Sequence, residues 1–245
     1  IVDTFFSKDA LNQHINPNIK AKIITSFSMF YDLEDPLKFA QEIESTLDID
    51  GVWAFENSYL PLMLKTNSFD TICHEHLEYY SFTALKWILD KAKLKVIDIS
   101  FNDTNGGSIF LITAKQSSPI KEASEDIGKL LTEEFESKLH LMDPYLTFKE
   151  SIDKCKENII TFLNDAKSKG KRVAGLGAST KGNVLLQYCN IKEDLIECIG
   201  EVNPDKFGCY TPGTSIPIVS EASILDTEYD YYFVLPWHFK NNFLS

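Results

Sequence analysis

The chain has 245 residues, 44% of them hydrophobic and 24% charged, which is typical of a folded protein with one large or two modest domains. Its 36 acidic and 24 basic residues give a formal net charge of −12, so nucleic acid is not expected as a bulk partner. No apolar run approaches the roughly 20 residues of a membrane-spanning helix, and no signal peptide opens the chain. We therefore expect a cytoplasmic protein without a membrane partner.

Short β-rich runs alternate with helical patterns through most of the sequence, which favours the α/β class with a mainly parallel sheet. Asp35 and Pro36 form an N-cap and a first-turn proline, Asp50 and Gly51 predict a turn, and Ser81 can cap a further helix. We expect strands at residues 22–27, 52–55, 93–99 and 108–114, with helices following Asp35 and Ser81.

Residues 117–150 are acidic and helical in pattern, and a second helical stripe follows a break at Asp143 and Pro144. These stripes predict packing surfaces between domains, with a partner-binding helix as the alternative. We place a helical connector at residues 117–168, between a domain at 1–116 and another at 169–245.

The last part restarts the α/β pattern, with strands expected at residues 171–174, 196–202 and 231–235. A glycine-rich turn at residues 175–183 stands between the first of these strands and a helix. Such a turn lets the backbone approach a phosphate, and Lys181 adds a positive charge. The turn matches neither the dinucleotide fingerprint nor the Walker loop, so it indicates either an anion site or a tight turn that permits strand–helix packing.

Two histidines and a glutamate stand together at His74, Glu75 and His76, directly before an aromatic run. In an extended backbone the two histidines would share one face. Imidazole titrates near neutral pH, so either histidine could act as a general base. A hydrogen-bonded structural role and a zinc site are the competing interpretations. The five cysteines contain no Cys-x-x-Cys pair, so buried free thiols are expected and neither disulfides nor a zinc ribbon is indicated.

Taken together, the motifs resemble the sugar C-methyltransferases, which use S-adenosylmethionine to methylate a carbon of nucleotide-linked keto-deoxysugars. The resemblance covers nearly the whole chain. It is carried by Phe69-Asp70-Thr71-Ile72, His74-Glu75-His76, Tyr80-Ser81, Asn105-Gly106-Gly107-Ser108, the turn at 175–183 with Gly175, Gly177, Ala178, Lys181, Gly182 and Asn183, and Pro212-Gly213 with Ile216-Pro217.

The resemblance implies a fold and a mechanism. A class I methyltransferase (Rossmann-like) sheet, partial in this chain, would be followed by a second Rossmann-like domain that binds the nucleotide sugar. His76 matches the general base that forms an enolate, and Glu75 matches a residue that positions the substrate or the base. Ser28 takes the place of a residue near the cofactor. The residues expected to contact the diphosphate or nucleotide are Gly177, Ala178, Ser179, Lys181 and Asn183. No metal ligand is implied, and nothing in the sequence specifies an oligomeric state.

The chain also departs from the family pattern. Cys73 stands where members carry a tyrosine, Asn105 where they commonly carry a histidine, and Ser28 where they often carry an asparagine. By the resemblance, residues 1–6 correspond to the third strand of the methyltransferase sheet. The zinc module, the S-adenosylmethionine loop and a closing C-terminal strand would then be missing, the strand at 22–27 would be an exposed edge, and cofactor binding by this chain would be weak.

Two other functions stay open at this point. A noncatalytic nucleotide-sugar-binding protein of the same fold would explain Cys73, Asn105 and the missing cofactor loop. A nicotinamide-dependent oxidoreductase using residues 175–182 would need a third glycine, where the chain has Thr180, and a downstream acid for the ribose.

Overall fold

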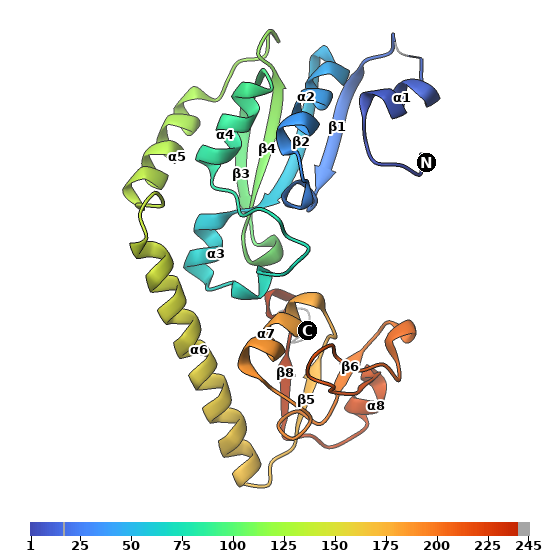
Figure 1. The fold of residues 1–245 in the computed structure, drawn as a ribbon, viewed down its shortest axis with the longest axis vertical. Coiled ribbons are helices and arrows are strands. Elements are labelled where there is room, and N and C mark those ends of the chain that lie inside the picture. Colours follow the sequence, from blue (N-terminus) through green and yellow to red (C-terminus); the bar gives the residue numbers. More distant parts are fainter. Residues whose placement is uncertain (17, 240–245) are drawn as a thin grey trace. The chain divides into compact units, whose positions relative to one another are not determined.

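The computed structural model describes residues 1–16 and 18–239 and divides the chain into two compact units. Unit 1 comprises Ile1–Thr66 and Glu75–Pro144, and unit 2 comprises Asn67–His74 and Tyr145–Ser245 (Figure 1). Each unit contains a four-stranded sheet with helices, so the α/β class is confirmed. No helix among the described residues is long and apolar enough to cross a bilayer.

The sheet of unit 1 has the order β1-β2-β4-β3. Only β1 and β2 pair in parallel, because β4 runs antiparallel to both of its neighbours. A mainly parallel sheet was therefore the wrong expectation for this unit. The strand β1 lies at the edge, as predicted for residues 22–27. The strands are β1 (Ala21–Phe27), β2 (Leu47–Ser58), β3 (Leu94–Asn102) and β4 (Ser108–Lys115).

Helices pack on one face of this sheet (Figure 1). The fully buried rings of Trp53 and Phe55 belong to the core between the sheet and these helices. Both predicted caps form: the Asp35 side chain accepts from the Lys38 N–H at 2.9 Å and Ser81 from the Ala84 N–H at 3.2 Å. The helices of this unit are α1 (Lys8–His14), α2 (Pro36–Thr46), α3 (Leu60–Thr66), α4 (Phe82–Lys91) and α5 (Ser124–Glu136), with 3₁₀ turns η1 (Phe30–Asp32) and η3 (Thr104–Gly106).

Two local predictions in unit 1 were wrong. The segment around Gly51 is not a turn but the middle of β2, and the reason is spatial: a Cβ at Gly51 would lie 2.4 Å from the Ala21 carbonyl oxygen of β1. The glycine therefore permits the close approach of two strands. Residues 1–6 form no strand, so their correspondence to a sheet strand is not seen in this structure.

The sheet of unit 2 is wholly parallel and has the order β7-β6-β5-β8. In chain order this is 3-2-1-4, the arrangement of a Rossmann-like half, as expected. The sequence did not indicate β7 or α8. The elements are β5 (Val173–Leu176), α7 (Thr180–Cys189), β6 (Ile199–Glu201), η4 (Pro204–Lys206), β7 (Ile218–Ser220), α8 (Glu221–Leu225), β8 (Tyr231–Val234) and η5 (Trp237–Phe239).

A short segment that ends at His74 belongs to unit 2. After α3 the chain contributes residues 67–74, including η2 (Phe69–Thr71), which packs on α7 through Phe69 and Tyr188, whose ring centroids lie 5.5 Å apart. It returns to unit 1 at Glu75. The later division falls after Pro144, inside the continuous helix α6 (Asp143–Ser168). These divisions differ from boundaries at 116 and 168, and the functional assignment of each domain stays a prediction.

Candidate active site

The carboxyl ends of β1 and β2 lie beside the loop before β4, at one end of the sheet in unit 1. We call this end of the strands the carboxyl edge of the sheet. Phe27 pairs with Glu56, and Ser58 pairs with Ser108, which sets this register. Ser28 follows β1 directly with φ 50°, and its N–H donates to the Glu56 carbonyl at 3.2 Å. A left-handed serine costs conformational energy, so the surrounding contacts hold the chain in a bend at this edge.

His76 is held against the 3₁₀ turn η1, which follows Ser28 in the chain. The N–H groups of Leu77 and Glu78 donate to the Tyr31 carbonyl at 3.0 and 3.1 Å. The buried ring of Tyr31 lies 4.4 Å from the His76 imidazole, centroid to centroid, at an interplanar angle of 53°. The backbone hydrogen bonds and the ring contact together hold the His76 side chain against Tyr31 of η1.

The other two members of the cluster are placed differently. His74 and Glu75 form an exposed turn, so the backbone is not extended there and the expected common face of His74 and His76 does not form. His74 is also the last residue of the segment that packs with unit 2. Within unit 1, His76 therefore contacts the 3₁₀ turn η1, which follows β1 and Ser28, and Glu75 lies within electrostatic reach of Asp32 on the same turn.

An acidic residue of η1, Asp32, lies within electrostatic reach of His76. Burial raises the pKa of Asp32, the charge of His76 lowers it, and the charge of Glu75 raises it. Asp32 is thus within electrostatic reach of both site residues. Tyr31 and Asp32 were not singled out in the sequence, although they follow the predicted strand at 22–27 within five residues, where ligand-contacting residues of α/β proteins concentrate.

Glu56 and Asn102, in a polar cluster next to Ser28, were also missed. Glu56 is 9% exposed, and its carboxylate accepts from the Asn102 amide at 2.6 Å. The Asn105 amide, in a residue with φ 57°, donates to the Ser28 hydroxyl at 3.4 Å. The signal that could have found Glu56 is a charged residue at the end of a hydrophobic strand. These groups give the carboxyl ends of β1 and β2 a set of hydrogen-bond donors and acceptors.

The glycine-rich turn of unit 2 is shaped by a close contact. Gly177 has φ 81°, and a Cβ there would lie 2.7 Å from two ring carbons of Pro236. The Ser179 hydroxyl caps α7 by accepting from the Gly182 N–H at 3.0 Å. The helix begins at Thr180, inside the stretch 175–183 that was expected to be a turn, so Lys181 and Asn183 lie in its first turn. The turn brings Gly177, Ala178 and Ser179 to the N-terminus of α7.

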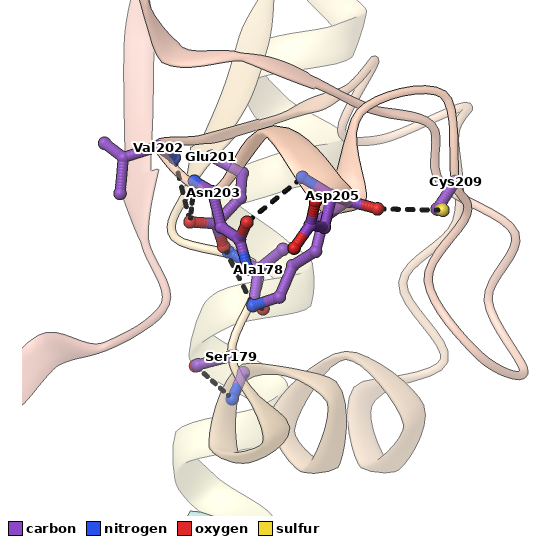
Figure 2. Close-up of polar contacts among 9 residues, drawn as sticks. Ala178, Ser179, Glu201, Val202, Asn203, Asp205 and Cys209 are labelled. Atoms are coloured by element: carbon purple, nitrogen blue, oxygen red, sulfur yellow. Dashed lines mark hydrogen bonds and ion pairs between the residues drawn. The ribbon is translucent and has the colours of Figure 1, made fainter.

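Glu201 braces this turn from the end of β6 (Figure 2). One carboxylate oxygen accepts from the Ala178 N–H at 3.1 Å and from Lys206 Nζ at 3.2 Å. The other accepts from the N–H groups of Val202 and Asn203 at 2.8 and 3.1 Å. Burial raises the pKa of Glu201, but these backbone donors and Lys206 lower it on balance.

The position of Glu201 tests the alternative of a nicotinamide-dependent oxidoreductase, which needs an acid that binds the ribose. An acid at the end of the second strand is the ribose-binding position of dinucleotide folds, and the sequence did not reveal one. Four donors from the protein occupy the roughly four acceptor sites of this carboxylate. Glu201 therefore holds the loop instead of presenting a free acceptor to a ribose.

A buried acid lies close to Lys181 in unit 2. Asp70 is 2% exposed and accepts from the Trp237 indole N–H at 2.9 Å. Burial raises the pKa of Asp70, while the Trp237 bond and the charge of Lys181 lower it. Burial lowers the pKa of Lys181, and Asp70 and Cys73 raise it. Lys181 of the glycine-rich turn therefore interacts electrostatically with Asp70 and Cys73, which belong to the segment of residues 67–74.

Residues suited to metal binding do not converge in the described part of the chain, where no group of three His, Cys, Asp or Glu side chains could hold an ion. All five cysteines are free thiols, and Cys209 and the half-buried Cys73 and Cys155 are not in the core.

Comparison with known proteins identifies the family of this chain. The family model for the C-methyltransferase C-terminal domain matches residues 103–245, so the chain belongs to the C-methyltransferase family. It is 30% identical over 219 residues to C-methyltransferase NovU of Streptomyces niveus, covering 89% of this chain and 52% of that protein. The chain thus spans about half the length of this relative.

Solved structures show only slight likeness. LepI in complex with SAM is 13% identical with a TM-score of 0.35, covering 40% of this chain and 28% of that one. An O-methyltransferase family 2 protein from Planctomyces limnophilus, in complex with apigenin, is 17% identical with a TM-score of 0.35, covering 41% and 33%. Likenesses of this size carry no statement about function.

Proposed function

We propose that this chain is the catalytic and substrate-binding portion of an S-adenosylmethionine-dependent C-methyltransferase that acts on a nucleotide-linked keto-deoxysugar in the cytoplasm. The observation that carries the proposal is the placement of His76 on η1, at the carboxyl edge of the sheet, in a chain of the C-methyltransferase family. Ligands of open α/β sheets bind at this edge.

His76 is proposed as the general base. A carbon beside a ketone is a poor nucleophile until it loses a proton, so a base must act before a carbon–carbon bond can form. The imidazole takes that proton and leaves an enolate, and Glu75, in the adjoining turn, positions the substrate or the base. A fixed imidazole avoids the entropic cost of ordering the base during the reaction.

Ser28 is the residue of this chain that we propose to lie beside the cofactor. S-adenosylmethionine supplies an electrophilic methyl group when bound. Ser28 fits a place beside it, because its hydroxyl and the Asn105 amide lie at the carboxyl edge of β1.

The turn of unit 2 is proposed to bind the diphosphate of the substrate. The first turn of α7 presents backbone N–H groups and Lys181, with Asn183 one residue beyond Gly182, and helix N-termini stabilise anions. Gly177, Ala178 and Ser179 bring the backbone close to such a ligand. The braced geometry around Glu201 supports a preformed site.

The test of the base is a solvent-exchange measurement on the full-length enzyme. With the nucleotide keto-sugar in deuterated water, the His76→Asn variant should lose exchange of the proton beside the ketone, while His74→Asn should keep most of it. Normal exchange in His76→Asn would remove His76 as the base.

A noncatalytic nucleotide-sugar-binding protein is the second candidate. Cys73 and Asn105, which replace residues typical of the family, favour it, since a thiol is a weaker hydrogen-bond donor than a phenol. Calorimetry with S-adenosylmethionine on the full-length protein separates the two functions. Tight cofactor binding together with methyl transfer would defeat the noncatalytic function.

A further inference from the structure

We propose that Asp32 is a positioning residue for His76, whose carboxylate orients the imidazole and stabilises its protonated form. The idea deepens the proposed function, because it concerns the residue assigned there as the general base. Its structural basis is the attachment of the His76 segment to the 3₁₀ turn that carries Asp32.

The attachment is made by two kinds of contact. The backbone bonds from Leu77 and Glu78 to the Tyr31 carbonyl hold the segment against η1, and the Tyr31 ring covers the imidazole at 4.4 Å. Tyr31 is buried and Phe30, its neighbour, is part of the core, so the turn itself is rigidly seated. Asp32 is the next residue and is therefore presented from a fixed backbone.

The charges that face His76 come from both segments. Asp32 follows Tyr31 on η1, and Glu75 and Glu78 flank the histidine on its own segment. The attraction between Asp32 and His76 is part of the balance that sets the ionisation of Asp32. By reciprocity, the same free energy stabilises the imidazolium.

Asp32 fits this role better than Glu75 does. Both side chains are exposed, but Asp32 is the shorter one and is attached to a turn anchored in the core, which leaves it fewer rotamers than Glu75 has in its own turn. A base that takes a proton from carbon gains positive charge as the reaction proceeds, and a fixed carboxylate stabilises that charge.

The decisive experiment is an NMR titration of the histidine ring signals in this chain. The chain has five histidines, and the His76 signal is assigned by its loss in His76→Asn. Asp32→Asn should lower the pKa of His76 by about half a unit or more. Asp32→Glu, which keeps the charge, should restore most of the shift. Asp98→Asn, which removes an exposed carboxylate from β3, is the control for net charge and should leave His76 unchanged.

An unchanged pKa of His76 in Asp32→Asn, with the fold intact by circular dichroism, would overturn the inference. So would an equal change in Asp98→Asn. The titration involves no catalysis, so its failure is separate from failure of the proposed function. If His76 proves not to be the base in the exchange experiment, the effect of Asp32 on its protonation is still measured.

Discussion

The phenol of Tyr59 donates a hydrogen bond to the Glu134 carboxylate at 2.7 Å, although the two residues are 75 positions apart. Glu134 is 4% exposed and accepts three further bonds, from the Phe82 N–H at 2.5 Å and from the Thr83 N–H and hydroxyl at 2.8 and 2.6 Å. A carboxylate on α5 thus satisfies free N–H groups at the start of α4. Burial raises the pKa of the Tyr59 phenol, and the Glu134 charge raises it further.

Glu134→Gln should therefore destabilise unit 1. An amide offers one acceptor oxygen instead of two and brings an NH₂ group toward donors, so the free energy of unfolding should fall by about 3 kcal/mol. Tyr59→Phe removes one bond and should cost about 1.5 kcal/mol. Urea unfolding measures both. Glu133→Gln, at an exposed neighbouring position, should change stability by less than about 0.5 kcal/mol. Equal stability of Glu134→Gln and Glu133→Gln would refute the stabilising role of the Glu134 carboxylate.

Gly177→Ala should cost more stability than Gly208→Ala. Both glycines have positive φ, at 81° and 78°, so alanine at either pays the strain of a left-handed residue, about 1 kcal/mol. At Gly177 the new Cβ also meets Pro236 at 2.7 Å, whereas no atom lies within 4 Å at Gly208. The difference between the two variants in thermal unfolding reports the clash. If the two midpoints fall equally, the contact with Pro236 does not constrain the turn.

His238 should make stability depend on pH. Burial lowers its pKa to about 4, with a further lowering by the charge of Lys181, against about 6.5 in the unfolded chain. Between these values the unfolded chain binds more protons, so this contribution is full above pH 6.5 and is lost as the pH falls through about 4. Solvent screening of the half-buried ring reduces the effect to about 1 kcal/mol.

The measurement is urea unfolding of the wild type and His238→Gln at pH 7.5 and pH 4.5. The variant should lose less stability over this interval, by about 1 kcal/mol. His14→Gln serves as the control, since that histidine is exposed on α1. An identical pH dependence in wild type and His238→Gln would contradict the prediction.

Glu201→Gln should loosen the glycine-rich turn. Because the folded-state pKa of Glu201 is lowered on balance, the charged form stabilises the fold at neutral pH, and this contribution disappears as the pH falls below about 4.5. The variant should be about 2 kcal/mol less stable at pH 7, with the gap narrowing toward pH 3. Hydrogen exchange at Ala178, Val202 and Asn203 should rise. Glu193→Gln, at an exposed position, is the matched control, and faster exchange in both variants alike would argue against the brace.

The sequence by itself determined the family and many of the local elements. Asp35 and Ser81 cap helices in the structure because a cap needs only a side-chain oxygen and an N–H three residues on. The glycine-rich turn before α7 and the α/β alternation could likewise be predicted, since periodicity and turn chemistry depend on neighbours in the chain.

Only the tertiary structure decided which distant groups meet. Gly51 looked like a turn, but it lies where β1 passes against β2. Trp237 and Asp70 are 167 positions apart, and nothing local to either residue indicates their bond. The contact of His76 with Tyr31 depends in the same way on how residues 75–78 cross η1. Burial and electrostatic pairing are set by the packed fold, and single-sequence patterns do not encode such partners.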